Sequence, residues 1–195
     1  MPEGAPVGDA PPFLTSEQRT ALLALARAAI CAEIRGTRLS AIPPDDPVLQ
    51  APGAAFVTLR HGQALRGCIG YIHALKPLAE TVMTCAVSAA KADPRFSPVR
   101  PDELSALTLE ISVLSPLVAV RDPGEIEVGR HGLLVSRAGR QGLLLPQVAT
   151  EFGWDREAFL SHTCQKAGLP PHAWREGADI RSFTVDHFTD QRPVG

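Results

Sequence analysis

The segment LRGCIGYI, residues 65 to 72, carries the residue best suited to chemistry, a cysteine two positions after an arginine in a predicted strand. A thiol becomes a nucleophile when it ionises; a nearby cation lowers its pKa, whereas apolar burial raises it. Because side chains alternate along a strand, Arg66 and Cys68 should lie on the same face. The sequence therefore predicts Cys68 as a candidate nucleophile beside a cation.

Two glycines and Ile69 lie around Cys68 in this segment, and the glycines leave two interpretations open. Glycine is uncommon inside a strand and marks a bulge or a close approach by a ligand or another backbone. Alternation places Gly67 and Ile69 on one face and Gly70 on the face of Cys68. The glycines either give a substrate access to the sulfur, or they accommodate a bulge or a crossing helix beside a buried, inert cysteine.

A second candidate cation follows the Asp93-Pro94 pair, where Arg95 and Phe96 are predicted to lie in a loop. The guanidinium group suits carboxylate or phosphate, so one hypothesis is that Arg66 and Arg95 hold an anionic group near the thiol. A thiol nucleophile is usually paired with a base. None of the six histidines has a diagnostic spacing to Cys68: they are His61, His73, His131, His162, His172 and His187.

Composition and motifs exclude several other classes of function. The chain has 195 residues and a net charge of −2, without the basic patches typical of nucleic-acid or membrane-surface binding. The four cysteines form no CxxC pair, which predicts reduced thiols and no metal site. The first residues lack the basic and apolar regions of a signal peptide and no apolar run is long enough to span a bilayer, so a cytoplasmic protein is expected. No phosphate-binding loop, dinucleotide-binding glycine motif, HExxH or GxSxG motif occurs, and no cofactor is predicted.

The elements that must position these residues predict an α+β fold with a mainly antiparallel sheet flanked by helices, because strands come in hairpins without regular βαβ alternation. Residues 1 to 12 are predicted to be a disordered tail, and residues 13 to 192 a single domain. Helices are expected near 15–36, 77–92 and 155–167, and strands near 54–60, 64–72, 108–114 and 179–188, with further short strands in 125–147.

Several motifs occur in the order seen in one family: LRGCIG, ADPRF, LEISVLSP, GLLLPQVA and FLSHTCQKAGLP. From about Phe56 to Phe188 the chain resembles the AmmeMemoRadiSam system protein A family, whose domain is shared with the AMME-syndrome chromosomal region candidate protein. The resemblance implies two unequal subdomains with a cleft between them, lined in part by LRGCIG. It implies no defined reaction. The motif residues it singles out are Arg66, Gly67, Cys68, Ile69, Gly70, Asp93, Pro94, Arg95, Phe96, Pro146 and Gln147.

The resemblance also implies two partners, a Memo-like protein and a radical S-adenosylmethionine enzyme. Two hypotheses follow. The first is an enzyme or enzyme component in which Cys68 reacts with or carries a substrate with an anionic group. The second is a non-catalytic binding module for one of these partners. One departure from the family pattern is Asp190, where a glutamate is commoner.

Overall fold

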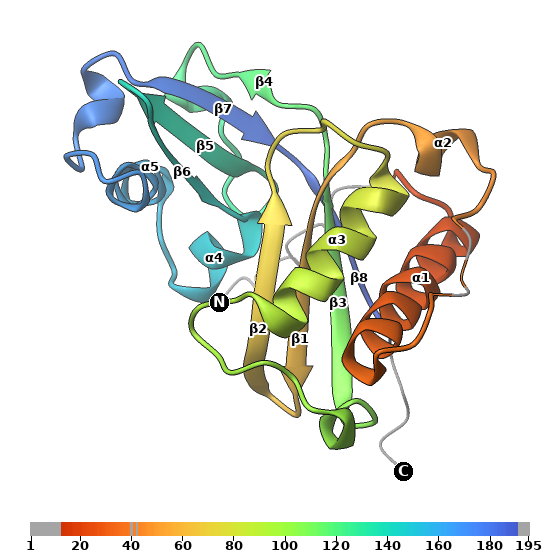
Figure 1. Cartoon of the computed structure of the whole chain (residues 1–195). Helices are drawn as coiled ribbons and strands as arrows, with labels where there is room; N and C mark the ends of the chain where they lie inside the picture. The colour runs from red at the N-terminus through yellow and green to blue at the C-terminus, as the bar shows by residue number, and fades with distance from the viewer. Residues whose placement is uncertain (1–12, 40, 42, 191–195) are drawn as a thin grey trace, which may run out of the picture. The chain divides into compact units, whose positions relative to one another are not determined.

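The computed structural model describes residues 13–39, 41 and 43–190, which form two compact units. The predicted tail, residues 1 to 12, lies outside the described residues. The larger unit comprises Phe13–Leu114 and the chain from Asp186 onward, and the smaller unit comprises Ser115–Val185. Each unit contains one four-stranded sheet with helices, which confirms the predicted α+β class (Figure 1).

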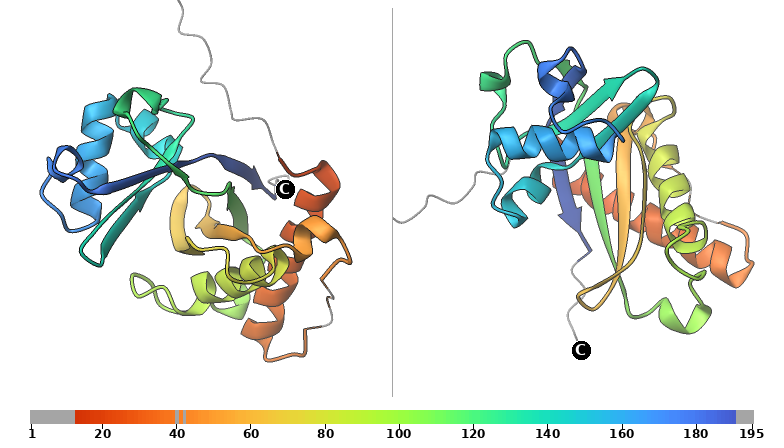
Figure 2. Two further views of the ribbon diagram at one scale, coloured as in Figure 1. Left: turned by 90° about the horizontal axis from the view of Figure 1, so that it is seen from above. Right: turned by 90° about the vertical axis from the view of Figure 1, so that its left-hand side faces the viewer.

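The larger unit is built on an antiparallel sheet in the order β2-β1-β3-β8. Helices α1 and α3 pack against each other and against this sheet, on the same side (Figures 1 and 2). Its elements are α1 (Ser16–Arg35), α2 (Pro47–Gln50), β1 (Ala54–His61), β2 (Ala64–Tyr71), α3 (Leu78–Lys91), β3 (Leu107–Leu114) and β8 (Val185–Thr189).

Local sequence signals explain where α1 begins and ends. The Thr15 hydroxyl accepts the Gln18 N–H, and the Gln18 side chain accepts the Thr15 N–H, which completes a capping box. Gly36 ends the helix in the left-handed region, with φ 65°. Side chains such as Leu22 and Ile30 then pack into the core of the larger unit.

The hairpin of β1 and β2 holds the candidate cysteine on an outer strand. Leu59 pairs with Gly67 and Arg60 pairs with Leu65, so Arg66 is an extra residue in β2, which makes a β-bulge. From Gly67 onward the register places Cys68 opposite Thr58. The bulge turns Arg66 toward the open edge of the sheet, where the segment after α3 runs.

The smaller unit has its own antiparallel sheet in the order β4-β7-β5-β6, and α5 packs against β5 and β6 (Figure 2). Its separate core includes Leu133, Phe159 and Leu160. Asp155 caps α5, as its position predicts. The elements are β4 (Val118–Ala119), β5 (Gly132–Arg137), β6 (Arg140–Leu144), α4 (Pro146–Glu151), α5 (Arg156–Lys166) and β7 (Asp179–Phe183).

The single strand predicted for residues 179–188 is wrong, because this segment forms β7 in one sheet and β8 in the other. Thr184 separates them. Its N–H donates to the Ser115 hydroxyl and its carbonyl accepts the Ser115 N–H, both at 2.9 Å. These bonds keep the backbone of Thr184 out of the hydrogen-bond ladders of both sheets. The alternation of side chains in the sequence continues through Thr184, although the chain passes there from one sheet to the other.

Asp190 follows β8 and anchors the end of this strand. Its carboxylate accepts the Leu109 N–H at 2.6 Å and the Arg27 Nε–H at 2.9 Å. Asp190, at which the sequence departs from the commoner glutamate of the family pattern, therefore makes structural contacts. Within the described ranges, no helix is long and apolar enough to cross a bilayer.

Packing of α3 on β2 gives a first testable prediction, the effect of Gly67→Ala. A Cβ at Gly67 would lie 2.1 Å from the Ala89 carbonyl oxygen, which belongs to the backbone of α3. The helix would have to move, so we expect a loss of about 2 kcal/mol in the free energy of unfolding, measured by urea denaturation.

Gly70→Ala is the matched control. Its Cβ would meet the Phe56 ring at 2.2 Å, and a ring can rotate away more easily than a helix backbone can move. We therefore expect a smaller loss than for Gly67→Ala. Equal stability of Gly67→Ala and the native protein would show that α3 does not fix this glycine.

Candidate functional site

The backbone of Cys68 is held from outside the sheet. Its N–H donates to Asp93 Oδ2 at 2.8 Å, and its carbonyl oxygen accepts Arg95 Nη2 at 3.3 Å. Because β2 is an edge strand, these groups would otherwise be open to pairing with another chain. Asp93 and Arg95 thus cap the edge at the cysteine.

Asp93 and Arg95 form an ion pair with two parallel hydrogen bonds. Arg95 Nε lies 2.9 Å from Asp93 Oδ1, and Nη2 lies 2.7 Å from Oδ2. Asp93 is only 3 % exposed. Its pKa lies well below its usual range, because the hydrogen bonds from Arg95, with further ones from the backbone N–H groups of Cys68 and Arg95, outweigh the opposing effect of burial.

Arg66 fastens the same edge at a second point. Its guanidinium donates to both carboxylate oxygens of Glu103, at 2.8 and 3.1 Å, and to the carbonyls of Ser97 and Pro98 at 2.8 and 3.3 Å. Hydrogen bonds from Arg66 are the main reason that the pKa of Glu103 falls to about 2. Both arginines of the predicted anion site are therefore already paired with carboxylates.

One pocket of about 500 Å³ brings the two sequence motifs together, because Arg66 of LRGCIG and Phe96 of DPRF both line it. The Arg95 guanidinium also lies 5.4 Å from the Phe96 ring centre. The sequence does not predict the other lining residues as part of a site: they are His61, Ser97, Arg100, Asp102 and Glu103. All of them except His61, which ends β1, follow α3 closely, so their position depends on how the chain after α3 folds back.

The Cys68 sulfur lies on the sheet face opposite α3. The Thr58 hydroxyl, directly across from it on β1, donates to Sγ at 3.2 Å. Cys68 is half-buried, whereas Cys85 and Cys164 are fully buried. Burial raises the pKa of Cys85 to about 12 and also raises that of Cys164. Cys68 thus differs from the core thiols in both access and hydrogen bonding.

The neighbouring motif residues have packing roles. Gly67 admits the Ala89 carbonyl of α3, as the crossing-helix interpretation predicts, and Ile69 packs on the core of the larger unit. The space beside Gly70 is taken by the Phe56 ring. These glycines are therefore explained by contacts inside the unit, and access for a substrate is not needed to explain them.

A row of polar side chains continues across this face of the sheet. Thr58 pairs with Cys68 on one side and with Glu110 on the other. One row further, Ser112 Oγ lies 3.1 Å from His187 Nδ1. The sequence predicts neither the place of Thr58 beside Cys68 nor the pairing of Ser112 with His187. The bulge at Arg66, which is one of the alternatives that the glycines left open, sets the register that brings Thr58 to Cys68.

The structure assigns other partners to three histidines of the smaller unit. His131 Nδ1 accepts the Glu127 N–H at 3.1 Å, His162 stacks on Trp154 at 3.9 Å between ring centres, and His172 lies 3.6 Å from Glu176. Over the residues that the structure describes, no three metal-ligating side chains gather into one group.

Pro146 and Gln147 belong to the smaller unit, at the start of α4. Pro146 is buried and occupies the first turn, where its missing N–H costs no helical hydrogen bond. Their predicted place in a cleft with the Cys68 segment stays a prediction.

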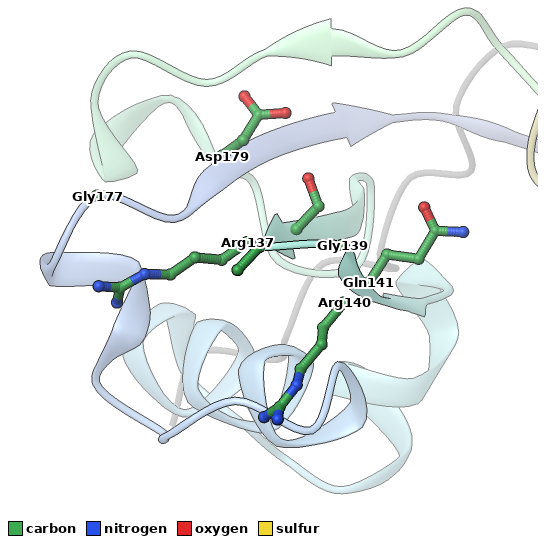
Figure 3. A pocket seen from close by; sticks show the side chains of 8 residues that line it. Arg137, Gly139, Arg140, Gln141, Gly177 and Asp179 are labelled. Carbon is green, nitrogen blue, oxygen red and sulfur yellow. The ribbon is translucent and has the colours of Figure 1, made fainter.

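A second pocket, of about 470 Å³, lies in the smaller unit at the β5–β6 hairpin (Figure 3). Its two arginines point apart: Arg137 lies 3.7 Å from Glu176, and Arg140 donates to the Gly168 carbonyl at 2.9 Å. None of the predicted site residues lines this pocket. The chemistry predicted from the sequence therefore points to the β2 edge of the larger unit.

Comparison with known proteins defines the class. The AMMECR1 family model matches residues 23–188, so the chain belongs to the AMMECR1 family, and the predicted resemblance is confirmed. A protein of Thermococcus gammatolerans is 45 % identical over 187 residues, covering 89 % of this chain and 91 % of the relative. One of Methanothermobacter thermautotrophicus is 48 % identical over 167 residues, covering 82 % and 86 %.

A solved structure shares the fold. The crystal structure of protein PH0010 from Pyrococcus horikoshii aligns with a TM-score of 0.81 at 41 % sequence identity, covering 89 % of this chain and 92 % of that one. The architecture described above is therefore similar to one seen by experiment.

The Arg66–Glu103 pair gives a prediction of pH dependence. The pKa of Glu103 falls from 4.5 to about 2 on folding, so the pair stabilises the protein above pH 4.5 and this stabilisation is lost as the pH falls toward 2. We expect Glu103→Gln to lower the free energy of unfolding by about 2 kcal/mol at pH 7, since a charge-assisted bidentate pair is lost.

The same measurement at lower pH checks the sign. The difference between native protein and Glu103→Gln should shrink steadily between pH 5 and pH 2, by urea unfolding at each pH. Glu80→Gln, which removes an exposed ion pair between α3 and Lys76 just before it, should change stability little at any pH. A constant difference for Glu103→Gln would contradict the assignment.

Proposed function

We propose that the protein is an enzyme or enzyme component in which Cys68 reacts with, or transiently holds, a substrate. The observation that carries the proposal is the Thr58 hydroxyl, which donates to Cys68 Sγ at 3.2 Å on a sulfur outside the hydrophobic core. A hydrogen-bond donor favours the charged form of its acceptor, and the thiolate is the nucleophilic form of cysteine.

The rest of the edge supports this role by fixing the thiol. Asp93 and Arg95 hold both backbone polar groups of Cys68, which limits the positions that its side chain can take. In the covalent step, the thiol gives its proton to water or buffer, the sulfur forms a bond to an electrophilic carbon, and a leaving group departs with its electron pair. The product is a substrate tethered to Cys68.

Of the two arginines, Arg95 is the better candidate for an anionic group of the substrate. Its side chain is 55 % exposed despite the pair with Asp93, whereas that of Arg66 is 15 % exposed and holds the loop onto the edge. A second hydrogen bond from Arg95 to a carboxylate or phosphate is compatible with its planar fork of donors.

Alkylation of the four cysteines tests the proposal. We expect iodoacetamide to modify Cys68 in the native protein below about pH 8, while Cys85 and Cys164 stay protected until the protein unfolds. Thr58→Val should slow Cys68 alkylation about 5- to 10-fold at neutral pH, because about 1 kcal/mol of hydrogen bonding to the sulfur is lost. Peptide mass spectrometry reads each site separately.

Thr84→Val provides the matched control, since that hydroxyl bonds the Glu80 carbonyl within α3. Alkylation of Cys68 should be unchanged in this variant. If Cys68 is as unreactive as Cys85 in the native protein, the nucleophile proposal fails.

A non-catalytic binding module is the second candidate, favoured by apolar side chains exposed around the end of β2. Leu75 is 85 % exposed and Tyr71 is 45 % exposed. We propose this 71–75 segment, with the Cys68 edge beside it in the chain, as a docking surface for a Memo-like protein or a radical S-adenosylmethionine enzyme. Apolar side chains with polar neighbours are typical of such surfaces.

Binding of purified partners by isothermal calorimetry tests this candidate. Leu75→Asp should weaken binding at least about tenfold, because burying a charge in an apolar contact is unfavourable. Val48→Asp changes an exposed apolar residue of α2 and should leave the affinity unchanged. Failure of the native chain to bind either partner would count against the binding module.

A further inference from the structure

The Ser112–His187 pair is a polar contact that the Cys68 proposal does not use. Ser112 lies on β3 and is 5 % exposed, while His187, on the neighbouring β8, is exposed. The hydroxyl oxygen and Nδ1 are 3.1 Å apart. One ring nitrogen is thus fixed by a buried group, and the ring itself reaches the surface.

This pair shares a sheet face with Cys68 but lies too far away to act on its sulfur. Ser112 is directly across from Phe56, and Phe56 is directly across from Gly70, two residues beyond Cys68. Adjacent strands are about 4.8 Å apart, so β8 lies roughly 14 Å from β2 across the sheet. His187 therefore cannot take the thiol proton directly, and any shared ligand must be elongated.

The surface between the two groups is apolar at Phe56, whose ring extends over Gly70. The nearby acidic side chains are already compensated. Glu110 is paired with Arg60 at 2.6 Å, and the buried Asp186 is paired with Arg19 at 2.9 Å. Repulsion between these carboxylates and an anion at His187 is therefore reduced.

We infer that His187 binds the carboxylate end of an elongated ligand whose other end reaches Cys68. The inference rests on the proposed function and names its substrate class: an acyl compound with an electrophilic carbon at one end, an apolar middle over Phe56 and a carboxylate terminus. When the Ser112 hydroxyl donates to Nδ1, the neutral imidazole carries its proton on Nε2 and presents an N–H donor to the carboxylate.

The two residues have different roles in this arrangement. His187 is the binding residue, and Ser112 is a positioning residue that fixes the ring and its tautomer. Loss of Ser112 should therefore weaken recognition of the carboxylate less than loss of His187 does.

Affinity labelling of Cys68 in the full chain tests the inference. The probes are the bromoacetamide of ε-aminohexanoic acid, its methyl ester, and iodoacetamide as a short reagent. We expect His187→Asn to raise the half-saturating concentration of the carboxylate probe about 5- to 10-fold, with a smaller rise for Ser112→Ala. Rates with the ester and with iodoacetamide should be unchanged, as should all rates in His172→Asn, which changes an exposed histidine of the smaller unit.

Ser112→Thr keeps the hydroxyl, so it should restore much of the affinity that Ser112→Ala loses. A general loss of structure would instead slow all three probes alike. Equal saturation by the acid and the ester in native protein, with Cys68 still reactive toward iodoacetamide, overturns the inference and leaves the proposed function intact.

An unreactive Cys68 would refute the proposed function, so a second measurement tests His187 without the thiol. Titration with ε-acetamidohexanoate should shift the imidazole NMR signals of His187 and not those of His172, in the smaller unit. A shift at His187 with a silent Cys68 means that the carboxylate contact exists without the covalent step. No shift at His187 overturns the inference whatever Cys68 does.

Discussion

The buried Asp93 carboxylate is the contact on which the candidate site depends. It accepts the N–H of Cys68 and pairs with Arg95, which in turn donates to the Cys68 carbonyl. A single ion pair thereby replaces the missing neighbour strand at the edge of the sheet. Its position follows from α3, because the helix ends at Lys91 and returns the chain to β2 two residues later. Helix α3, which covers the core, thus also positions the Asp93 carboxylate that holds the backbone of Cys68.

Close packing between α3 and β2 fixes the position of Asp93 relative to Cys68. With only a hydrogen at Gly67, the Ala89 carbonyl can approach the strand more closely than any other residue would allow. The two sides of the strand that carries the LRGCIG motif therefore have separate roles. One side receives the helix, and the other presents the sulfur to Thr58. Neighbouring residues of the motif are thus constrained by shape on the first side and by chemistry on the second.

Local signals in the sequence were sufficient for most elements and for the class of fold. The capping box at Thr15 and Gln18, the left-handed Gly36 and the alternation of β3 were all readable because each depends on residues close in the chain. The contacts of the candidate site could not be predicted from local signals alone. A hairpin without the bulge at Arg66 would place Val57, not Thr58, opposite Cys68. The contacts of Cys68 with Asp93 and of Ser112 with His187 join residues 25 and 75 positions apart, so no spacing rule predicts them. The change of sheet at Thr184 could not be predicted either, because the alternation of side chains in the sequence continues through this residue.

The position of β8 in the sequence also determines when the sheet of the larger unit can be completed during synthesis. The larger unit consists of Phe13–Leu114 and the chain from Asp186, with the whole smaller unit inserted between them. Ribosomes release the chain from its N-terminus, so the smaller unit emerges before the larger one has its last strand. Until then β3 remains an open edge, and Arg27 and Leu109 lack Asp190. The unpaired edge of β3 is therefore exposed to mispairing while the whole smaller unit is being synthesised.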